Sequence, residues 1–148
     1  MGNRRKAREV SLQLLYETEL AHKSGGEVTE RFLKDPYCLL LEDESLGNPA
    51  LEEVKTFTRQ IIDGVSTNVR EIDQLVESHS THWKVSRMAS VDRNILRMAV
   101  FELLYCQDIP ASVTINEAIE IAKKYGTEES GAFVNGILDH IAKALKKI

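Results

Sequence analysis

Residues 114–145, TINEAIEIAKKYGTEESGAFVNGILDHIAKAL, carry two amphipathic helical patterns separated by a glycine. Apolar side chains recur every three or four residues on both sides of Gly126, which is the period of a helix with one buried face. The segment from Thr114 to Glu117 has the form of a capping box, in which a hydroxyl and a carboxylate accept hydrogen bonds from otherwise unpaired amides. Gly126 is a natural helix stop, so the second helix is expected to start near Thr127 or Glu128.

Helical spacing continues through most of the chain toward the N-terminus. Strict alternation of apolar and polar residues, the sign of a half-buried strand, is nearly absent. Gly64 and the triplet 66–68 mark either a boundary between two helices or a kink within one. Further helices are expected over residues 3–21, 28–33, 51–65, 69–76 and 90–106. The sequence therefore predicts an all-α protein of about seven helices, split near residue 80 by a connection that Trp83 anchors.

Length and composition restrict the class of protein. The chain has 148 residues, 43% of them hydrophobic and 28% charged, which suits one domain or two small subdomains with a buried core. Cys38 and Cys106 are too few for a disulfide framework, and no metal spacing links them. No apolar run approaches the roughly 18 residues of a membrane span, and Glu17 and Glu19 interrupt the stretch that a signal peptide would need. These features predict a soluble, cytoplasmic globular protein.

Positive charge is concentrated at the N-terminus although the net charge is −4. The first eight residues include Arg4, Arg5, Lys6 and Arg8 and contain no acid. At the start of a helix such charges oppose the helix dipole by about a few tenths of a kcal/mol each, and the three arginines are expected on or near the face opposite the buried stripe. A local basic patch attracts a polyanion even on an acidic protein. Nucleic-acid binding is one interpretation, and a solvated terminus without a role is the other.

The sequence offers no motif of a catalytic or metal site. It has neither of the common glycine-rich phosphate loops and no Gly-x-Ser-x-Gly elbow. Cys106 falls in an apolar helical stripe and is expected in the core. His79 and His82 are spaced to share a helix face, but no third ligand stands near them in sequence. We therefore predict no catalysis, no metal, no cofactor and no small-molecule substrate.

Two segments together carry a family resemblance. The first is Arg4-Arg5-Lys6-Ala7-Arg8-Glu9, continuing to Leu14-Leu15-Tyr16. The second runs from Asp92 to Asp139 and includes Ile95-Leu96-Arg97, Ile115-Asn116-Glu117-Ala118-Ile119-Glu120 and Phe133-Val134-Asn135-Gly136. In order, separation and helical pattern, these segments resemble the NusB family of bacterial antitermination factors. The resemblance extends over essentially the whole chain.

The resemblance implies both a fold and a function. The implied fold is all-helical, with two packed helical bundles in a single RNA-binding domain over residues 1–148, divided at about residue 80. The implied function is to bind a single-stranded boxA-type RNA together with NusE, a ribosomal protein of the small subunit. The complex would join the elongating RNA polymerase with other Nus factors, suppress termination and support ribosomal RNA synthesis.

A surface that binds single-stranded RNA needs cations for the phosphates and flat groups for the bases. Arg4, Arg5, Lys6 and Arg8 are the candidate cations. Phe133 is the candidate flat group, and it precedes the apolar stripe of its helix by one position. Core packing is therefore the alternative for Phe133, while the resemblance favours stacking on RNA.

Further RNA-site residues follow from the same segment. Asn135 is a candidate for hydrogen bonds to RNA, with local helix polarity as its alternative, and the resemblance places the acid of Glu129 near the RNA surface. Gly136 costs a helix about 1 kcal/mol relative to alanine, which suits a close backbone approach, and we interpret it as structural. Family members often carry a base immediately before the phenylalanine, but Ala132 stands there in this chain. This departure weakens the phosphate contact expected at that edge.

The resemblance also implies a surface for NusE. Tyr16 and Asp92 match positions at or near that contact, and Arg97 borders either this surface or the RNA site. A tyrosine at the edge of the core, and an aspartate that its helix dipole favours, are the alternatives for the first two.

Two alternative functions are association with a catalytic partner and a purely structural role. NusB-like domains also occur fused to RNA cytosine methyltransferases, but 148 residues leave no room for such a catalytic fold, so only a separate catalytic partner fits. A purely structural adaptor would bind NusE or another protein and no RNA.

Overall fold

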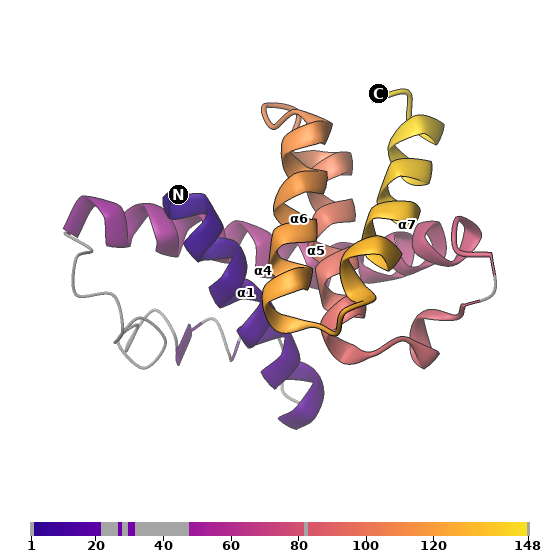
Figure 1. Cartoon of the computed structure of the whole chain (residues 1–148). Coiled ribbons are helices and arrows are strands. Elements are labelled where there is room, and N and C mark those ends of the chain that lie inside the picture. The colour runs from indigo at the N-terminus through magenta and orange to yellow at the C-terminus, as the bar shows by residue number, and fades with distance from the viewer. Residues whose placement is uncertain (1, 22–26, 28–29, 32–47, 82, 148) are drawn as a thin grey trace. The chain divides into compact units, whose positions relative to one another are not determined.

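The computed structural model describes residues 2–21, 27, 30, 31, 48–81 and 83–147. In this part of the chain the regular structure consists of five α-helices and one 3-10 turn, with no strand (Figure 1). The all-α prediction is therefore confirmed for the described residues, while the expected helix over 28–33 falls largely outside them. None of the described helices is both long and apolar enough to cross a membrane.

The chain forms two compact units, Met1–Ser66 and Thr67–Ile148. In the first unit, α1 (Asn3–Ala21) has the bounds that the sequence predicts. Its buried stripe includes Ala7, Val10 and Leu14, and the same unit buries Phe57 and Ile61 from α4. Burial of these apolar side chains is what stabilises the first unit.

The long helix α4 (Asn48–Ser78) contains one residue outside helical geometry, Asn68, with φ −113° and ψ 18°. The sequence left open whether two helices meet here or one helix bends, and the structure shows two helical segments that are joined across a kink at Asn68. The Tyr105 hydroxyl donates to Asn68 Oδ1 at 3.3 Å and also to the carboxylate of Glu71. The Tyr105 side chain of α5 (Ser90–Tyr105) therefore contacts polar side chains at and just after the kink.

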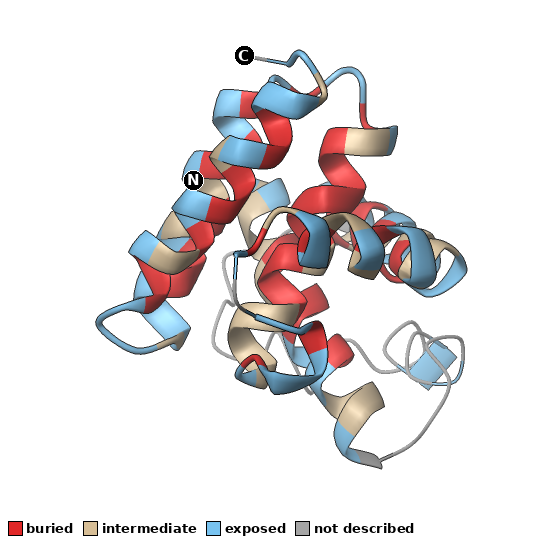
Figure 2. Cartoon of the chain, turned by 90° about the vertical axis from the view of Figure 1, so that its right-hand side faces the viewer, coloured by how far each residue is buried: buried red, intermediate tan, exposed pale blue. Residues whose placement is uncertain are grey.

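The second unit is built around three helices that pack against one another, α5 (Ser90–Tyr105), α6 (Ala111–Tyr125) and α7 (Ser130–Ala144). Buried residues follow the inner side of each helix (Figure 2). Arg97 of α5 ties this group to α4, because its Nε and Nη2 donate to the two carboxylate oxygens of Asp73, both at 2.8 Å. Cys106 is buried, as predicted. A short 3-10 turn, η1 (Val85–Arg87), precedes α5.

The predicted capping box at Thr114 is wrong. The helix α6 begins earlier, at Ala111 after Pro110, so Thr114 lies inside the helix and faces the core. Its hydroxyl donates to Glu102 Oε1 of α5 at 3.0 Å, and both side chains are buried. The threonine thus donates a hydrogen bond to a buried carboxylate, a group that is costly to bury without hydrogen bonds, and does not cap the helix.

The predicted stop at Gly126 is confirmed, and the turn that follows is tight. The Gly126 amide donates to the Ala122 carbonyl at 2.8 Å, and the Ser130 hydroxyl accepts a hydrogen bond from the Thr127 amide at 2.9 Å. A Cβ at Gly126 would lie 2.4 Å from Ser130 Oγ and 2.8 Å from the Ala122 carbonyl oxygen. The last helix therefore begins at Ser130, slightly later than predicted, because residues 127–129 are used in the turn.

Two histidines connect the end of α4 with α7. His79 Nδ1 and His140 Nδ1 lie 2.7 Å apart, with the rings edge to face. Burial and the nearby charge of His140 lower the pKa of His79. The other histidine considered with His79, His82, lies outside the described residues. Within the described ranges no group of three histidine, cysteine or acidic side chains is placed to hold a metal ion.

Alanine substitutions at two glycines should have opposite effects on stability. Gly126→Ala forces a Cβ against Ser130 and the Ala122 carbonyl, so we expect the free energy of unfolding to fall by about 1–3 kcal/mol. A Cβ at Gly136 meets nothing within 4 Å, so Gly136→Ala should raise it by about 0.5–1 kcal/mol through helix propensity. Urea unfolding of both variants measures the difference, and effects of equal sign would contradict this account.

The histidine pair should make stability depend on pH. Because the pKa of His79 is lowered on folding, the unfolded chain binds more protons between that pKa and the ordinary value of about 6.5. The contribution of neutral His79 to the free energy of unfolding is therefore complete above about pH 6.5, and it is lost as the pH falls toward the lowered pKa. Urea unfolding at pH 7.5 and 5.5 should show a smaller decline for His79→Gln than for the unsubstituted protein. Identical declines would rule out His79 as the source.

Candidate nucleic-acid interface

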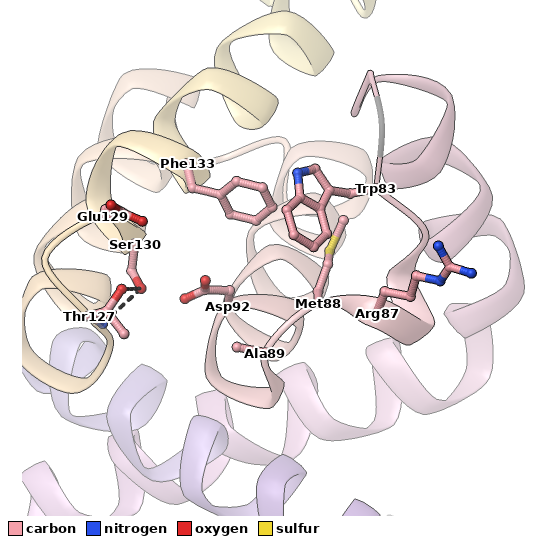
Figure 3. A pocket seen from close by; sticks show the side chains of 9 residues that line it. All are labelled: Trp83, Arg87, Met88, Ala89, Asp92, Thr127, Glu129, Ser130 and Phe133. Atoms are coloured by element: carbon pink, nitrogen blue, oxygen red, sulfur yellow. Dashed lines mark hydrogen bonds between the residues drawn. The ribbon is translucent and has the colours of Figure 1, made fainter.

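A pocket of about 280 Å³ opens in the second unit, where the connection after α4, the start of α5 and the start of α7 meet (Figure 3). Three of the residues predicted from the sequence line it together, namely Asp92, Glu129 and Phe133. The other lining residues are Trp83, Arg87, Met88, Ala89, Thr127 and Ser130. The pocket therefore combines an aromatic side with polar and charged groups.

The aromatic side consists of Trp83 and Phe133. Their ring centroids lie 6.0 Å apart and the rings are nearly perpendicular, at 81°. This is the edge-to-face arrangement that aromatic pairs favour. Phe133 is partly exposed and Trp83 is 50% exposed, so the predicted position of Phe133 at the edge of the apolar stripe is confirmed. Both rings keep surface available to a ligand.

Hydrogen bonds to the backbone fix the segment that carries Trp83. The guanidinium of Arg93 donates from Nη1 to the carbonyls of Val85, at 3.1 Å, and Met88, at 2.9 Å. The Ser80 hydroxyl donates to the Trp83 carbonyl at 2.8 Å. Together these bonds pair the backbone carbonyls of Trp83, Val85 and Met88.

The charged groups of the pocket lie on different sides of it. In Figure 3 the Arg87 side chain stands beyond Trp83 and Met88, whereas Asp92 and Glu129 lie toward the start of α7. Asp92 is in the first turn of α5, where the helix dipole favours an acid. Its Oδ1 is buried and accepts no hydrogen bond from the described residues.

The N-terminal cations are in the first unit, where Arg4 and Arg8 meet the same aromatic ring. Their guanidinium carbons lie 4.8 and 5.3 Å from the centroid of the Phe57 ring, within the range of cation–π attraction. Arg8 is only 4% exposed, so its predicted place opposite the buried stripe is wrong. One turn apart on α1, the two arginines share a face that Phe57 of α4 covers. Arg4 remains exposed.

The remaining predicted residues differ in exposure. Arg5 and Lys6 are partly exposed, and Asn135 is exposed on α7. Tyr16 is 44% exposed on α1. The Arg97 side chain is only 17% exposed and forms an ion pair with Asp73. In the structure it therefore joins α5 to α4. Its place at a partner surface stays a prediction.

The sequence reasoning did not assign Trp83, Arg87 or Met88 to the site. Trp83 was expected to anchor a connection, and the structure shows that half of its surface is exposed. The available signal was the segment from Lys84 to Arg97, where four bases face a single acid. For Gly136 the sequence predicted a close backbone approach. A Cβ at this position would meet no atom of the described residues within 4 Å, so the structure shows no such approach within the chain.

Comparison with known proteins identifies the family. The model of the NusB family matches residues 5–143. The chain belongs to the NusB family. The transcription antitermination protein NusB of Myxococcus xanthus (strain DK1622) is 46% identical to it, over 99% of both chains.

Solved structures of NusB proteins agree with this assignment. The structure of T. maritima NusB has a TM-score of 0.69 and 42% identity, covering 95% of this chain and 90% of that one. A crystal structure of the antitermination factors NusB and NusE in complex with double-stranded RNA has a TM-score of 0.78 and 27% identity, over 96% and 97% of the chains. The fold is therefore NusB-like, and the family consists of antitermination factors, not enzymes.

The burial of Arg8 predicts that it contributes to stability. Arg8→Ala removes a buried guanidinium from the Phe57 ring, so we expect the free energy of unfolding to fall by about 1–2 kcal/mol. Lys6→Ala, a neighbouring and partly exposed cation, should change it by no more than about 0.5 kcal/mol. Urea unfolding compares the two, and an unchanged stability of the Arg8 variant would show that Phe57 does not hold this side chain.

Proposed function

We propose that this protein is an RNA-binding transcription antitermination factor. It binds a single-stranded boxA-type RNA together with the ribosomal protein NusE and acts on the elongating RNA polymerase with other Nus factors, supporting ribosomal RNA transcription. The observation that carries the proposal is the match to the NusB family over residues 5–143. The NusB–NusE–RNA complex among its structural neighbours supports the choice of partners.

The cations of the first unit bind phosphates in this proposal. Arg4, Arg5 and Lys6 are exposed or partly exposed, so they are the three side chains that neutralise phosphate charge. Arg8 acts with them from its place over Phe57, where it positions the start of α1. Charges that oppose the dipole of their own helix are thus retained for binding.

The second unit supplies contacts to bases. Phe133 stacks on a base, and Asn135 donates or accepts a hydrogen bond beside it. The acid of Glu129 adjusts the charge of the surface near the RNA and does not attract the RNA itself. The partly exposed ring and the exposed amide support these roles. A stacked base contributes about 1–3 kcal/mol to single-strand binding.

The proposal also includes a surface for NusE, the domain organisation of the chain and its location in the cell. Tyr16 and Asp92, with Arg97 at the border, contact NusE. The whole chain acts as one NusB-like domain of about seven helices in two bundles, with helical subdomains of about 1–80 and 81–148, and it works in the cytoplasm. The compact units divide earlier than that, at Ser66.

The salt dependence of RNA binding tests the function directly. Affinity for labelled boxA-type RNA, measured by filter binding at two salt concentrations, should fall with a log–log slope of about −2 for three neutralised phosphates on a single strand. Addition of NusE should raise the affinity. Replacement of Arg4, Arg5 and Lys6 by alanine should weaken binding to all RNA sequences alike.

Three further observations separate the alternatives. A duplex of the same sequence distinguishes single-strand binding from binding to double-stranded RNA. Binding of NusE without any affinity for RNA, alone or in the complex, would refute the proposal and favour a structural adaptor. Copurification with a catalytic partner would instead favour a role in RNA modification.

A further inference from the structure

We propose that Trp83 forms, with Phe133, a pocket for one unpaired nucleobase, and that the strand enters this pocket with its phosphate beside Arg87. The inference rests on the proposed RNA-binding function and adds a site that the family resemblance did not assign. Its basis is the juxtaposition of an exposed aromatic pair with groups of opposite charge on two sides of one pocket.

The aromatic pair suits a base because its two rings do not stack on each other. At 81° and 6.0 Å, the edge of one ring meets the other, so ring surface remains open. Trp83 is 50% exposed, although burial of such a side chain is strongly favourable. A base that stacks on the indole would cover this surface, and every base has a face that can do so.

Side-chain donors hold backbone carbonyls at Trp83 and in the turn that follows it. Ser80 holds the Trp83 carbonyl, and Arg93 holds the carbonyls at both ends of the following turn. A surface fixed in this way loses little conformational freedom on binding. The backbone that carries the Trp83 indole is therefore held by hydrogen bonds without a ligand.

The charges of the pocket determine how a nucleotide lies in it. Asp92 and Glu129 repel a phosphate from the side nearest α7, while Arg87 attracts it on the side beyond Trp83. A carboxylate accepts hydrogen bonds from the amino groups of a base edge. The base therefore points toward α7, and the backbone of the strand passes Arg87.

The fluorescence of Trp83 provides a direct test, because the chain contains one tryptophan. Titration of the full-length protein with single-stranded boxA-type RNA should quench this fluorescence as RNA binds, and the anisotropy of labelled RNA reports occupancy independently. Trp83→Ala should lower RNA affinity about tenfold, whereas Trp83→Phe should retain most of it. Tyr125→Ala, which removes another exposed aromatic side chain outside the pocket, should leave affinity unchanged.

Arg87 has its own measurement and control. Arg87→Ala should reduce the log–log salt slope by about 0.7, the loss of one phosphate contact on a single strand. Arg70→Ala, an exposed arginine of α4 outside the pocket, should leave the slope as it is. Circular dichroism of each variant verifies that the helices are retained.

The outcomes separate this inference from the function on which it rests. RNA binding by anisotropy without quenching, and with equal affinity for Trp83→Ala, would overturn the base pocket and leave the proposed function intact. Loss of NusE binding by Trp83→Ala with unchanged RNA affinity would overturn it in favour of a protein contact. Absence of any RNA binding would overturn both.

Discussion

One guanidinium, that of Arg93, holds the segment on which the candidate interface depends. It donates to the carbonyls of Val85 and Met88 across the 3-10 turn before α5. Backbone carbonyls near a folded interior need such partners, because leaving them unpaired is costly. Since one side chain serves both ends of the turn, the turn and the residues beside it are fixed relative to α5. The meeting of Trp83 with Phe133 of α7 is thus a consequence of backbone hydrogen bonds as well as of contact between the rings.

The cations of the N-terminal helix α1 have different roles, because one of them is buried and the others are exposed or partly exposed. Arg4 and Arg8 both lie over Phe57, but only Arg4 remains exposed. A buried guanidinium on an aromatic ring contributes packing of its side-chain stem as well as electrostatic attraction. Arg5 and Lys6 keep part of their surface exposed. The basic stretch is therefore neither a solvated tail nor a uniform binding patch, since one of its members belongs to the core of the first unit.

Local spacing in the sequence predicted the features that depend on neighbours along the chain. The bounds of α1 and the stop at Gly126 follow from apolar period and from a glycine, and both are confirmed. The capping box at Thr114 failed because the same pattern also fits an internal helical turn, and the deciding partner is Glu102 of another helix. The burial of Arg8 and the pairing of Trp83 with Phe133 depend on contacts between segments that are far apart in the sequence. Such contacts produce no periodic pattern of apolar residues, so the sequence did not predict them. Position beside the apolar stripe was enough to place Phe133 at an edge, but it could not show which ring lies opposite.

Three features that oppose stability lie at the surfaces proposed to bind RNA. Cations stand in the first turns of α1 against its dipole, half of an indole ring is exposed, and a buried oxygen of Asp92 has no hydrogen bond from the described residues. Each of these costs free energy, and a sequence selected for stability alone would remove them. Consistency between local preference and global fold is the rule for a folded protein, and exceptions are expected where a ligand supplies the missing interaction. A polyanion would offset the charge conflict of α1, and a base in the pocket would cover the indole.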